Sequence, residues 1–130
     1  MATVTFRDET ATGKPLTEWE VAGLPERMTV RELIRLRVRE EVARHSARPS
    51  DCFNGLVRPD DAEAELNGYR LRGPRHIDWE RQAEIAERAF LSNGFFVLAA
   101  DRQVEELDEV VDLTVDPDLV FIKLVALVGG

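Results

Sequence analysis

Two short segments near the start of the chain alternate apolar and polar residues, and this pattern limits the folds that the chain can adopt. Residues 3–7 place Val4 and Phe6 on one side, and residues 16–21 place Trp19 and Val21 on one side. Alternation with a period of two is typical of half-buried β-strands. The polar segment between them contains a glycine and a proline, so the chain is predicted to begin as a β-hairpin.

A helix-start signal follows this hairpin directly. Thr29 and Glu32 have the spacing of a capping box, in which the threonine caps the helix and the glutamate bonds back to the threonine amide. Met28 and Leu33 stand where a hydrophobic staple forms. The spacing predicts a helix over residues 30–44, with the intervening arginines and glutamates facing water and one apolar stripe of Val30, Leu33, Ile34, Val38 and Val42.

Residues 44–94 are predicted to form an ordered insertion that contains a second helix. Asn67-Gly68 is a hairpin-turn signal. Asp78 is placed to cap the second helix, and Gly94 is placed to end it. The apolar stripe of this helix is predicted to consist of Trp79, Ala83, Ala86 and Phe90.

The last third of the chain is predicted to be mainly β-structure. Residues 95–100 form a continuous apolar run, which is typical of a central strand that is buried on both faces. Residues 103–104 are expected to form a short partner strand, and residues 119–128 a long final strand. The acidic segment between them is expected to be anchored by Leu107, Val110 and Val111.

Length, charge and cysteine content exclude several classes of protein. A chain of 130 residues is predicted to form a single domain. The formal net charge of −8 argues against a nucleic acid or an anionic membrane as partner. The single cysteine, Cys52, excludes an internal disulfide. Because there is no long apolar run and no signal-peptide pattern, we expect a cytoplasmic protein. We also expect a monomer.

The order of these segments, together with four local strings, resembles the ubiquitin-like β-grasp family in its bacterial type. Thr10-Ala11-Thr12-Gly13-Lys14 is similar to the first hairpin loop of that family, and residues 25–34 are similar to its helix entry. Residues 96–113 resemble its strand, turn and Gln-Leu-Glu segment, and residues 119–130 resemble its final strand and diglycine tail. Residues 44–94 have no counterpart in ubiquitin itself.

The resemblance implies an α+β fold, in which a mixed sheet packs on one long helix, here with an inserted segment that holds a second helix. It also implies that the protein is a substrate and not an enzyme, with no catalytic residues and no metal site of its own. An activating enzyme of the ubiquitin-activating or sulfur-carrier adenylyltransferase type would use its own ATP and magnesium to adenylate the carboxylate of Gly130. A conjugating enzyme and an isopeptidase would be further partners.

The expected activation tail consists of Leu127, Val128, Gly129 and Gly130. Glycine has no Cβ, so a diglycine can lie flat in a narrow channel that leads to a nucleotide. The apolar residues before the diglycine are equally similar to those of sulfur carriers, which bear a C-terminal thiocarboxylate. Three functions therefore stay open, namely a protein modifier joined to its targets by an isopeptide bond, a sulfur carrier, and an interaction module that is never activated.

Few other residues are candidates for chemistry or binding. Cys52, His45 and His76 lack the sequence context of a nucleophile with its base and the spacing of a metal site. Trp79 and Phe90 are most simply the face by which the second helix packs, and Glu105 and Glu106 are most simply part of a solvated acidic face. The functional alternative for these four residues is a partner surface. Because Lys14 and Lys123 are the only lysines, attachment in single copies is expected if the protein is a modifier.

Overall fold

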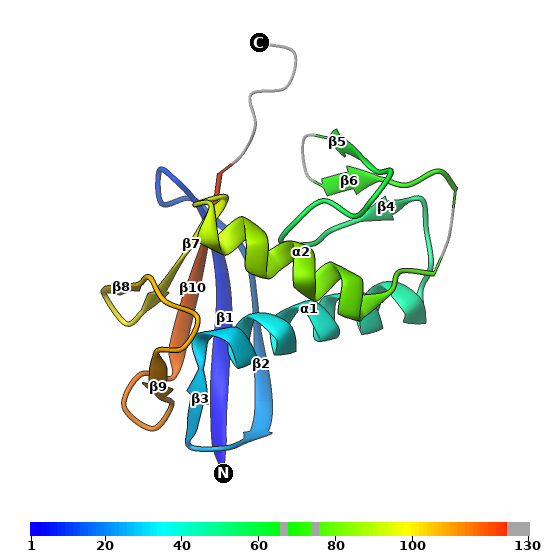
Figure 1. Cartoon of the computed structure of the whole chain (residues 1–130). Coiled ribbons are helices and arrows are strands. Elements are labelled where there is room, and N and C mark those ends of the chain that lie inside the picture. Colours follow the sequence, from blue (N-terminus) through cyan, green and yellow to red (C-terminus); the bar gives the residue numbers. More distant parts are fainter. Residues whose placement is uncertain (66–67, 74–75, 125–130) are drawn as a thin grey trace. The chain divides into compact units, whose positions relative to one another are not determined.

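The computed structural model describes residues 1–65, 68–73 and 76–124 and shows an α+β protein (Figure 1). Its described residues form a mixed five-stranded sheet, two smaller sheets and two helices. The elements are β1 (Ala2–Thr10), β2 (Pro15–Leu24), β3 (Arg27–Thr29), α1 (Val30–Ala47), β4 (Cys52–Phe53), β5 (Glu63–Glu65), β6 (Gly68–Arg70), α2 (Trp79–Leu91), β7 (Phe95–Ala99), β8 (Arg102–Val104), β9 (Val110–Asp112) and β10 (Asp118–Lys123).

The chain divides into two compact units. Unit 1 contains Met1–Leu33 and the described residues from 90 to 124, and unit 2 contains Ile34–Ala89. The boundaries fall inside α1 and inside α2. Unit 2 thus begins ten residues before the insertion that the sequence predicts, and the assignment of the whole chain to a single domain stays a prediction.

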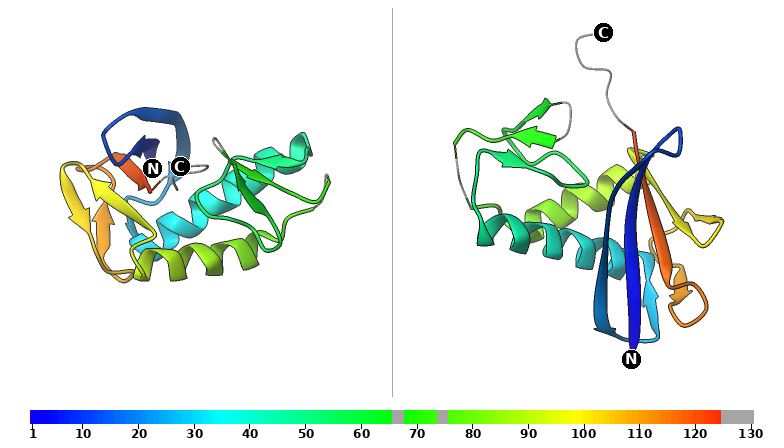
Figure 2. Two further views of the ribbon diagram at one scale, coloured as in Figure 1. Left: turned by 90° about the horizontal axis from the view of Figure 1, so that it is seen from above. Right: turned by 180° about the vertical axis from the view of Figure 1, so that it is seen from behind.

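Unit 1 contains the five-stranded sheet, in the order β2-β1-β10-β7-β8. β1 and β2 are antiparallel neighbours, with Phe6 opposite Trp19, which confirms the predicted hairpin. β1 lies between β2 and β10 (Figure 2) and runs parallel to β10, with Phe6 aligned to Leu119. β7 pairs antiparallel with β10, and β8 pairs antiparallel with β7. The first and last strands of the chain are therefore parallel neighbours in this sheet.

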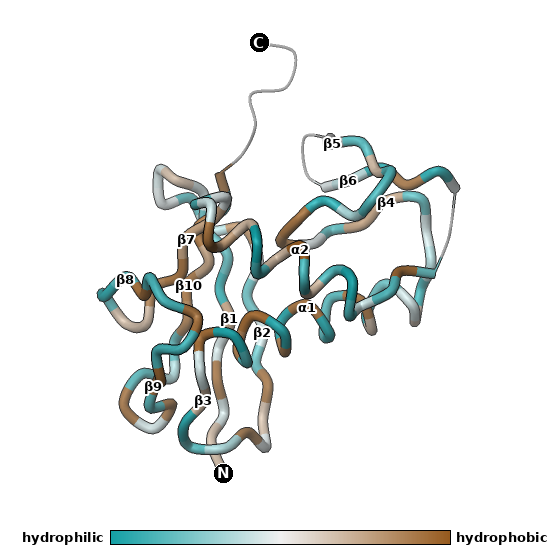
Figure 3. The backbone as a smooth tube through the Cα atoms, viewed as in Figure 1, coloured by the Kyte–Doolittle hydropathy of each residue, from teal (hydrophilic) through white to brown (hydrophobic). Residues whose placement is uncertain are grey.

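The core of unit 1 is built from aromatic rings on one face of this sheet. Phe6 and Phe121 are fully buried, and their ring centroids lie 5.7 Å apart in an edge-on arrangement. Phe95 continues the cluster at 6.3 Å from Phe121, which is within the range of favourable ring pairs. Hydrophobic positions recur along β7 and β10 in Figure 3.

Burial on β7 alternates, so the prediction of a strand buried on both faces was wrong. Phe95, Val97 and Ala99 are buried, whereas Phe96 and Leu98 are only half-buried. A continuous apolar run indicates that both faces of a strand are hydrophobic, but it does not indicate whether another part of the chain covers the second face.

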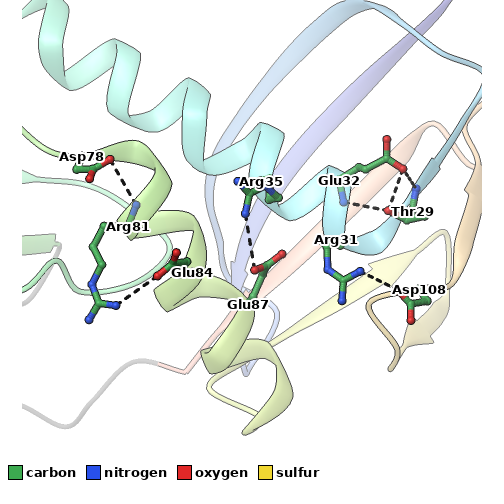
Figure 4. A network of polar contacts seen from close by, with 9 residues as sticks. All are labelled: Thr29, Arg31, Glu32, Arg35, Asp78, Arg81, Glu84, Glu87 and Asp108. Atoms are coloured by element: carbon green, nitrogen blue, oxygen red, sulfur yellow. Dashed lines mark hydrogen bonds and ion pairs between the residues drawn. The ribbon is translucent and has the colours of Figure 1, made fainter.

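The start of α1 forms the predicted capping box. The Glu32 amide donates a hydrogen bond to Oγ1 of Thr29 at 3.1 Å, and the Thr29 amide donates to Oε1 of Glu32 at 3.1 Å (Figure 4). Met28 and Leu33 are both buried. The amides of Val30 and Arg31 donate to the carbonyls of Glu109 and Leu107 at 2.9 Å, so the first turn is tied to the acidic segment.

β3 and β9 form a two-stranded sheet beside this helix start. Leu107 and Val111 are buried, as predicted, but Val110 is 56% exposed. Val110 was therefore wrongly predicted as an anchor, because neighbouring residues on a strand face opposite sides.

Unit 2 contains the rest of both helices and a three-stranded sheet in the order β4-β6-β5. The predicted stripe residues Ile34, Val38 and Val42 are buried on α1, as are Ala83 and Ala86 on α2. The expectation that every charged residue of α1 faces water was wrong for two of them. Arg37 and Glu41 are 2% and 6% exposed.

β5 and β6 are antiparallel neighbours where the Asn67-Gly68 signal predicts a hairpin, but Gly68 was wrongly predicted as a turn residue. Gly68 lies inside β6 and pairs with Glu65 of β5, so it is a strand residue and not the second turn residue. Asn67 lies outside the described residues. A Cβ on Gly68 would come within 2.5 Å of Oδ1 of Asn54, which explains why glycine occupies this strand position.

Both ends of α2 are capped. Oδ1 of Asp78 accepts the amide of Glu80 at 3.0 Å, as predicted. At the other end, Asn93 adopts the left-handed conformation with φ of 62°, and its amide bonds to the carbonyl of Phe90 at 3.2 Å. The left-handed residue after the helix is thus Asn93, and not Gly94 as expected.

Candidate functional site

The site that the sequence singles out lies beyond the end of β10. This strand runs Asp118–Lys123, and its last residue aligns with Thr10 of β1 and with Phe95 of β7. Leu124, the last described residue, is 48% exposed. The final strand thus stays paired on both sides up to Lys123.

The predicted activation tail follows this point. Leu127, Val128, Gly129 and Gly130 lie outside the described residues. Their assignment as the activation tail stays a prediction. The described part of unit 1 shows that the strand preceding them is a central strand of the sheet, between β1 and β7.

Four apolar residues share the sheet face opposite the aromatic core of unit 1, and we call them the second sheet face. Phe96 lies opposite Ile122, and Leu98 lies opposite Val120. Phe96, Leu98 and Ile122 are half-buried, and Val120 is 8% exposed. The sequence did not indicate this surface, because every residue in the run 95–100 is apolar. The run therefore does not show which side chains of the strand are buried and which are half-buried.

Trp79 was a candidate for the partner surface, and its indole is half-buried among arginines of unit 2. The guanidinium carbons of Arg35 and Arg39 lie 5.4 and 5.6 Å from the ring centroid, which is cation–π distance. Arg35 also pairs with Glu87 of α2 at 3.8 Å (Figure 4). These contacts join α1 to α2 within unit 2, so much of the indole serves packing.

Phe90 was a second candidate for this surface, and its burial corrects that expectation. Its side chain is only 6% exposed, and its ring lies 5.9 Å from that of Phe95. This burial agrees with the interpretation of the apolar stripe of α2 as a packing face, and Phe90 belongs to the core of unit 1.

Glu105 and Glu106 are exposed, as a partner surface requires. Their acidic neighbours form ion pairs within unit 1. Asp108 pairs with Arg31 at 2.8 Å, and Glu109 pairs with Arg102 at 2.7 Å. Two acidic residues of this segment are therefore paired within unit 1, although the side chain of Asp108 is still 82% exposed.

A buried polar cluster in unit 2 holds the chain around residues 54–57. Arg37 Nε and Glu41 Oε1 form an ion pair of 2.5 Å, and both carboxylate oxygens of Glu41 accept the Leu56 amide at 3.2 Å. Nε2 of Gln82 donates to the Val57 carbonyl at 2.8 Å. Buried charges require such partners, so the arrangement is structural.

The pKa of Tyr69 is raised in the same unit. Burial is the largest cause, the Glu41 carboxylate adds to it, and the Arg58 guanidinium opposes it. The phenol of Tyr69 therefore keeps its proton to a higher pH than an ordinary tyrosine does.

The pKa of Asp112 in unit 1 is lowered. The main cause is the Thr114 hydroxyl, which donates to Oδ1 of Asp112 at 2.6 Å, followed by the Thr114 amide at 3.0 Å. Arg27 lies 3.9 Å from the other carboxylate oxygen and acts in the same direction. This aspartate fixes the turn after β9.

Cys52 and His45 occupy separate structural positions in unit 2. The Cys52 thiol lies 4.0 Å from Oδ1 of Asn54. Nε2 of His45 lies 3.1 Å from the carbonyl of Ser50, and its ring meets Phe53 edge-on at 5.5 Å. Within residues 1–65, 68–73 and 76–124, no three His, Cys, Asp or Glu side chains are grouped so that they could hold a metal ion. In the same part of the chain, neither helix is long and apolar enough to cross a membrane.

Comparison with known proteins gives no assignment for this arrangement. No family model matches the chain, and neither a curated protein nor a solved structure matches it.

Proposed function

We propose that this chain is a cytoplasmic ubiquitin-like protein modifier with a β-grasp fold in unit 1. Its Gly130 carboxylate is activated by adenylation and thioester formation and is then joined to target proteins. The reacting group belongs to the modifier, whereas ATP, magnesium and the catalytic residues belong to an activating enzyme.

The observation that carries this proposal is the strand order of unit 1. A β-grasp sheet has the first hairpin at one side, the final strand parallel to the first strand, and the remaining strands beyond it. The order β2-β1-β10-β7-β8, with β1 parallel to β10, agrees with that pattern. The capped helix α1 follows the hairpin after the short strand β3, and a helix also follows the first hairpin in a β-grasp.

The position of β10 supports the role of the tail. A strand that is paired on both sides up to Lys123 provides a rigid base for the residues that follow. At about 3.3 Å for each extended residue, residues 127–130 would reach roughly 13 Å beyond their starting point. Such a reach suits a carboxylate that must enter a narrow nucleotide site.

A sulfur carrier is the second candidate, and the apolar character of Leu127 and Val128 favours it. Activation by adenylation is common to both functions. They differ in whether the acyl group ends on a target amine or on sulfur as a thiocarboxylate.

The experiment recovers the whole chain, tagged at its N-terminus, from its native cells under denaturing conditions. Because Lys123 is the last basic residue, trypsin leaves the peptide Leu124-Val125-Ala126-Leu127-Val128-Gly129-Gly130 on any target lysine. Finding this remnant in isopeptide linkage is the expected result. Exchange of one terminal oxygen for sulfur indicates the sulfur carrier.

A variant lacking Gly129 and Gly130 is the control. It should lose both the remnant and the sulfur exchange while unit 1 remains folded. If the wild-type tail is recovered only as the unmodified acid, the chain acts as an interaction module and the proposal is wrong.

A further inference from the structure

The longest strand of unit 1 lies at an edge of its sheet. In the sheet of the described residues, β2 pairs with β1 alone, and the strand at the opposite edge, β8, has only three residues. β2 has ten residues, of which Pro15–Glu18, Glu20, Ala22 and Gly23 are exposed. β2 is therefore the main free edge of this sheet.

The backbone of this edge is regular enough to accept another strand. Pairing between β1 and β2 is continuous from Val4 with Val21 to Asp8 with Thr17. In an antiparallel pair, every second residue of an edge strand directs its amide and carbonyl away from its partner. These groups are available to an extended segment that adds to the sheet.

The side chains of β2 define what such a segment must look like. Glu18 and Glu20 lie on one face, opposite Arg7 and Thr5 of β1. Trp19 lies on the other face, next to Val21 in the alternation, and its half-buried ring is 5.7 Å from the ring of Phe6. An added strand would meet carboxylates on one face and an apolar surface on the other.

The charge of unit 1 favours a basic segment. Unit 1 contains 14 of the 25 acidic residues but only six of the 17 basic ones, so the formal net charge of −8 belongs to this unit. Arg7 lies 3.6 Å from Glu18, but Glu18 still has a 58% exposed side chain. Opposite charges on adjacent strands stabilise the pairing, and like charges weaken it.

We infer that the free edge of β2 binds an extended protein segment in which basic residues alternate with apolar ones. A second copy of this chain fits less well, because pairing of two β2 edges would bring the glutamates of both copies together. The inference does not depend on activation of the tail, and its test leaves the tail untouched.

The test uses the whole chain and three synthetic peptides. The first peptide alternates valine and arginine, the second alternates valine and glutamate, and the third keeps the arginines but replaces the central valines by proline. Only the first should bind saturably and slow hydrogen exchange at alternate amides of β2. The proline peptide has the same charge but cannot form the ladder.

Two charge-matched variants separate edge recognition from simple attraction to an acidic protein. Glu18→Lys with Glu20→Lys should weaken binding of the valine–arginine peptide about tenfold or more, since two cross-strand pairs change from attraction to repulsion. Glu26→Lys with Asp101→Lys changes the net charge equally on exposed residues of unit 1 outside β2, and should leave affinity within about twofold. The valine–glutamate peptide should bind the first variant better than it binds the wild type.

Three results would overturn the inference. One is equal weakening in the two charge-matched variants, another is equal binding of the proline peptide, and the third is protection of β2 by self-association without any peptide. Circular dichroism of each variant establishes that loss of binding is not loss of the fold.

Discussion

Arg37 and Glu41 are the pair of residues for which hydrophobic periodicity was most misleading. Both lie on α1 at a spacing of four residues, which on a solvated helix face gives a weak exposed ion pair. Here their side chains are 2% and 4% exposed, and Glu41 also accepts the Leu56 amide. A charge in that position must keep its partner, because removal of one member leaves the other buried without compensation.

Arg37→Met is therefore expected to lower the free energy of unfolding by about 3–5 kcal/mol, the usual cost of breaking a buried pair. Arg39→Met on the same helix is the matched control. It removes an exposed guanidinium that lies over Trp79, so its cost should be about 1 kcal/mol or less. Urea denaturation measures both variants, and equal losses would contradict the buried-pair account.

Thr114→Val is expected to raise the pKa of Asp112 toward its ordinary value. The hydroxyl of Thr114 is the main cause of the lowered pKa, and valine removes it at similar volume. Because the folded-state pKa is the lower one, this interaction stabilises the fold above the unfolded-state pKa, and the stabilisation is lost as pH falls through the folded-state pKa. NMR titration of the Asp112 carboxyl carbon measures the change, and Thr3→Val, at an exposed residue of β1, should leave that titration unaltered.

At the scale of elements, the start of α1 depends on a local bond that the sequence predicts. Thr29→Ala removes the cap and should lower the free energy of unfolding by about 1 kcal/mol. Ser46→Ala changes an exposed residue in the last turn of the same helix, where no N-cap is lost, and should change stability by less than about 0.5 kcal/mol. Thermal unfolding of the two variants tests this difference, and the account of the capping box is wrong if they unfold alike.

Elements set by local signals were predictable from the sequence. The hairpin follows from alternation, and the start of α1 follows from Thr29 and Glu32. Asp78 likewise caps α2 as its residue type suggests. In each case the decisive bond joins residues that are close in sequence.

Features that depend on distant partners were not predictable. Whether Phe96 faces the core depends on what covers each face of the sheet, and burial of Glu41 depends on a chain segment fifteen residues away. Asn93 adopts the left-handed conformation after α2. Gly94 had been predicted there, because glycine is the residue that most often adopts this conformation at the end of a helix. For the candidate site, the sequence pointed to the tail and to Glu105, but Phe90 proved to be a core residue.

At the scale of the whole molecule, the proposed function makes Val128 part of a recognition segment that an apolar groove of the activating enzyme receives. Val128→Arg should slow activation by about tenfold or more, which corresponds to roughly 1.4 kcal/mol of lost interaction. Val128→Leu keeps the apolar character and should be activated at a rate close to that of the wild type. Conjugate yield over time measures both, and normal activation of the arginine variant would refute an apolar groove.

Attachment as single copies is a second prediction at this scale. Lys14 is exposed in the loop between β1 and β2, and Lys123 is half-buried at the end of β10, so amines that could extend a chain are scarce. Lys14→Arg should leave the mass distribution of conjugates unchanged. Recovery of the tail remnant on Lys14 itself would show chain formation and contradict this expectation.

Trapping the acyl group with hydroxylamine tests the central claim most directly. The tagged chain is incubated with hydroxylamine in an extract of its native cells, with and without ATP and magnesium. The mass of its C-terminal tryptic peptide is then measured by mass spectrometry. The nitrogen of hydroxylamine attacks the activated acyl carbon and expels AMP or a thiol, leaving a hydroxamate on Gly130. The account predicts that this hydroxamate forms only with ATP and is absent from the variant lacking Gly129 and Gly130. A peptide that remains the free acid under every condition, in an extract whose other ATP-dependent acyl transfers are active, would contradict it.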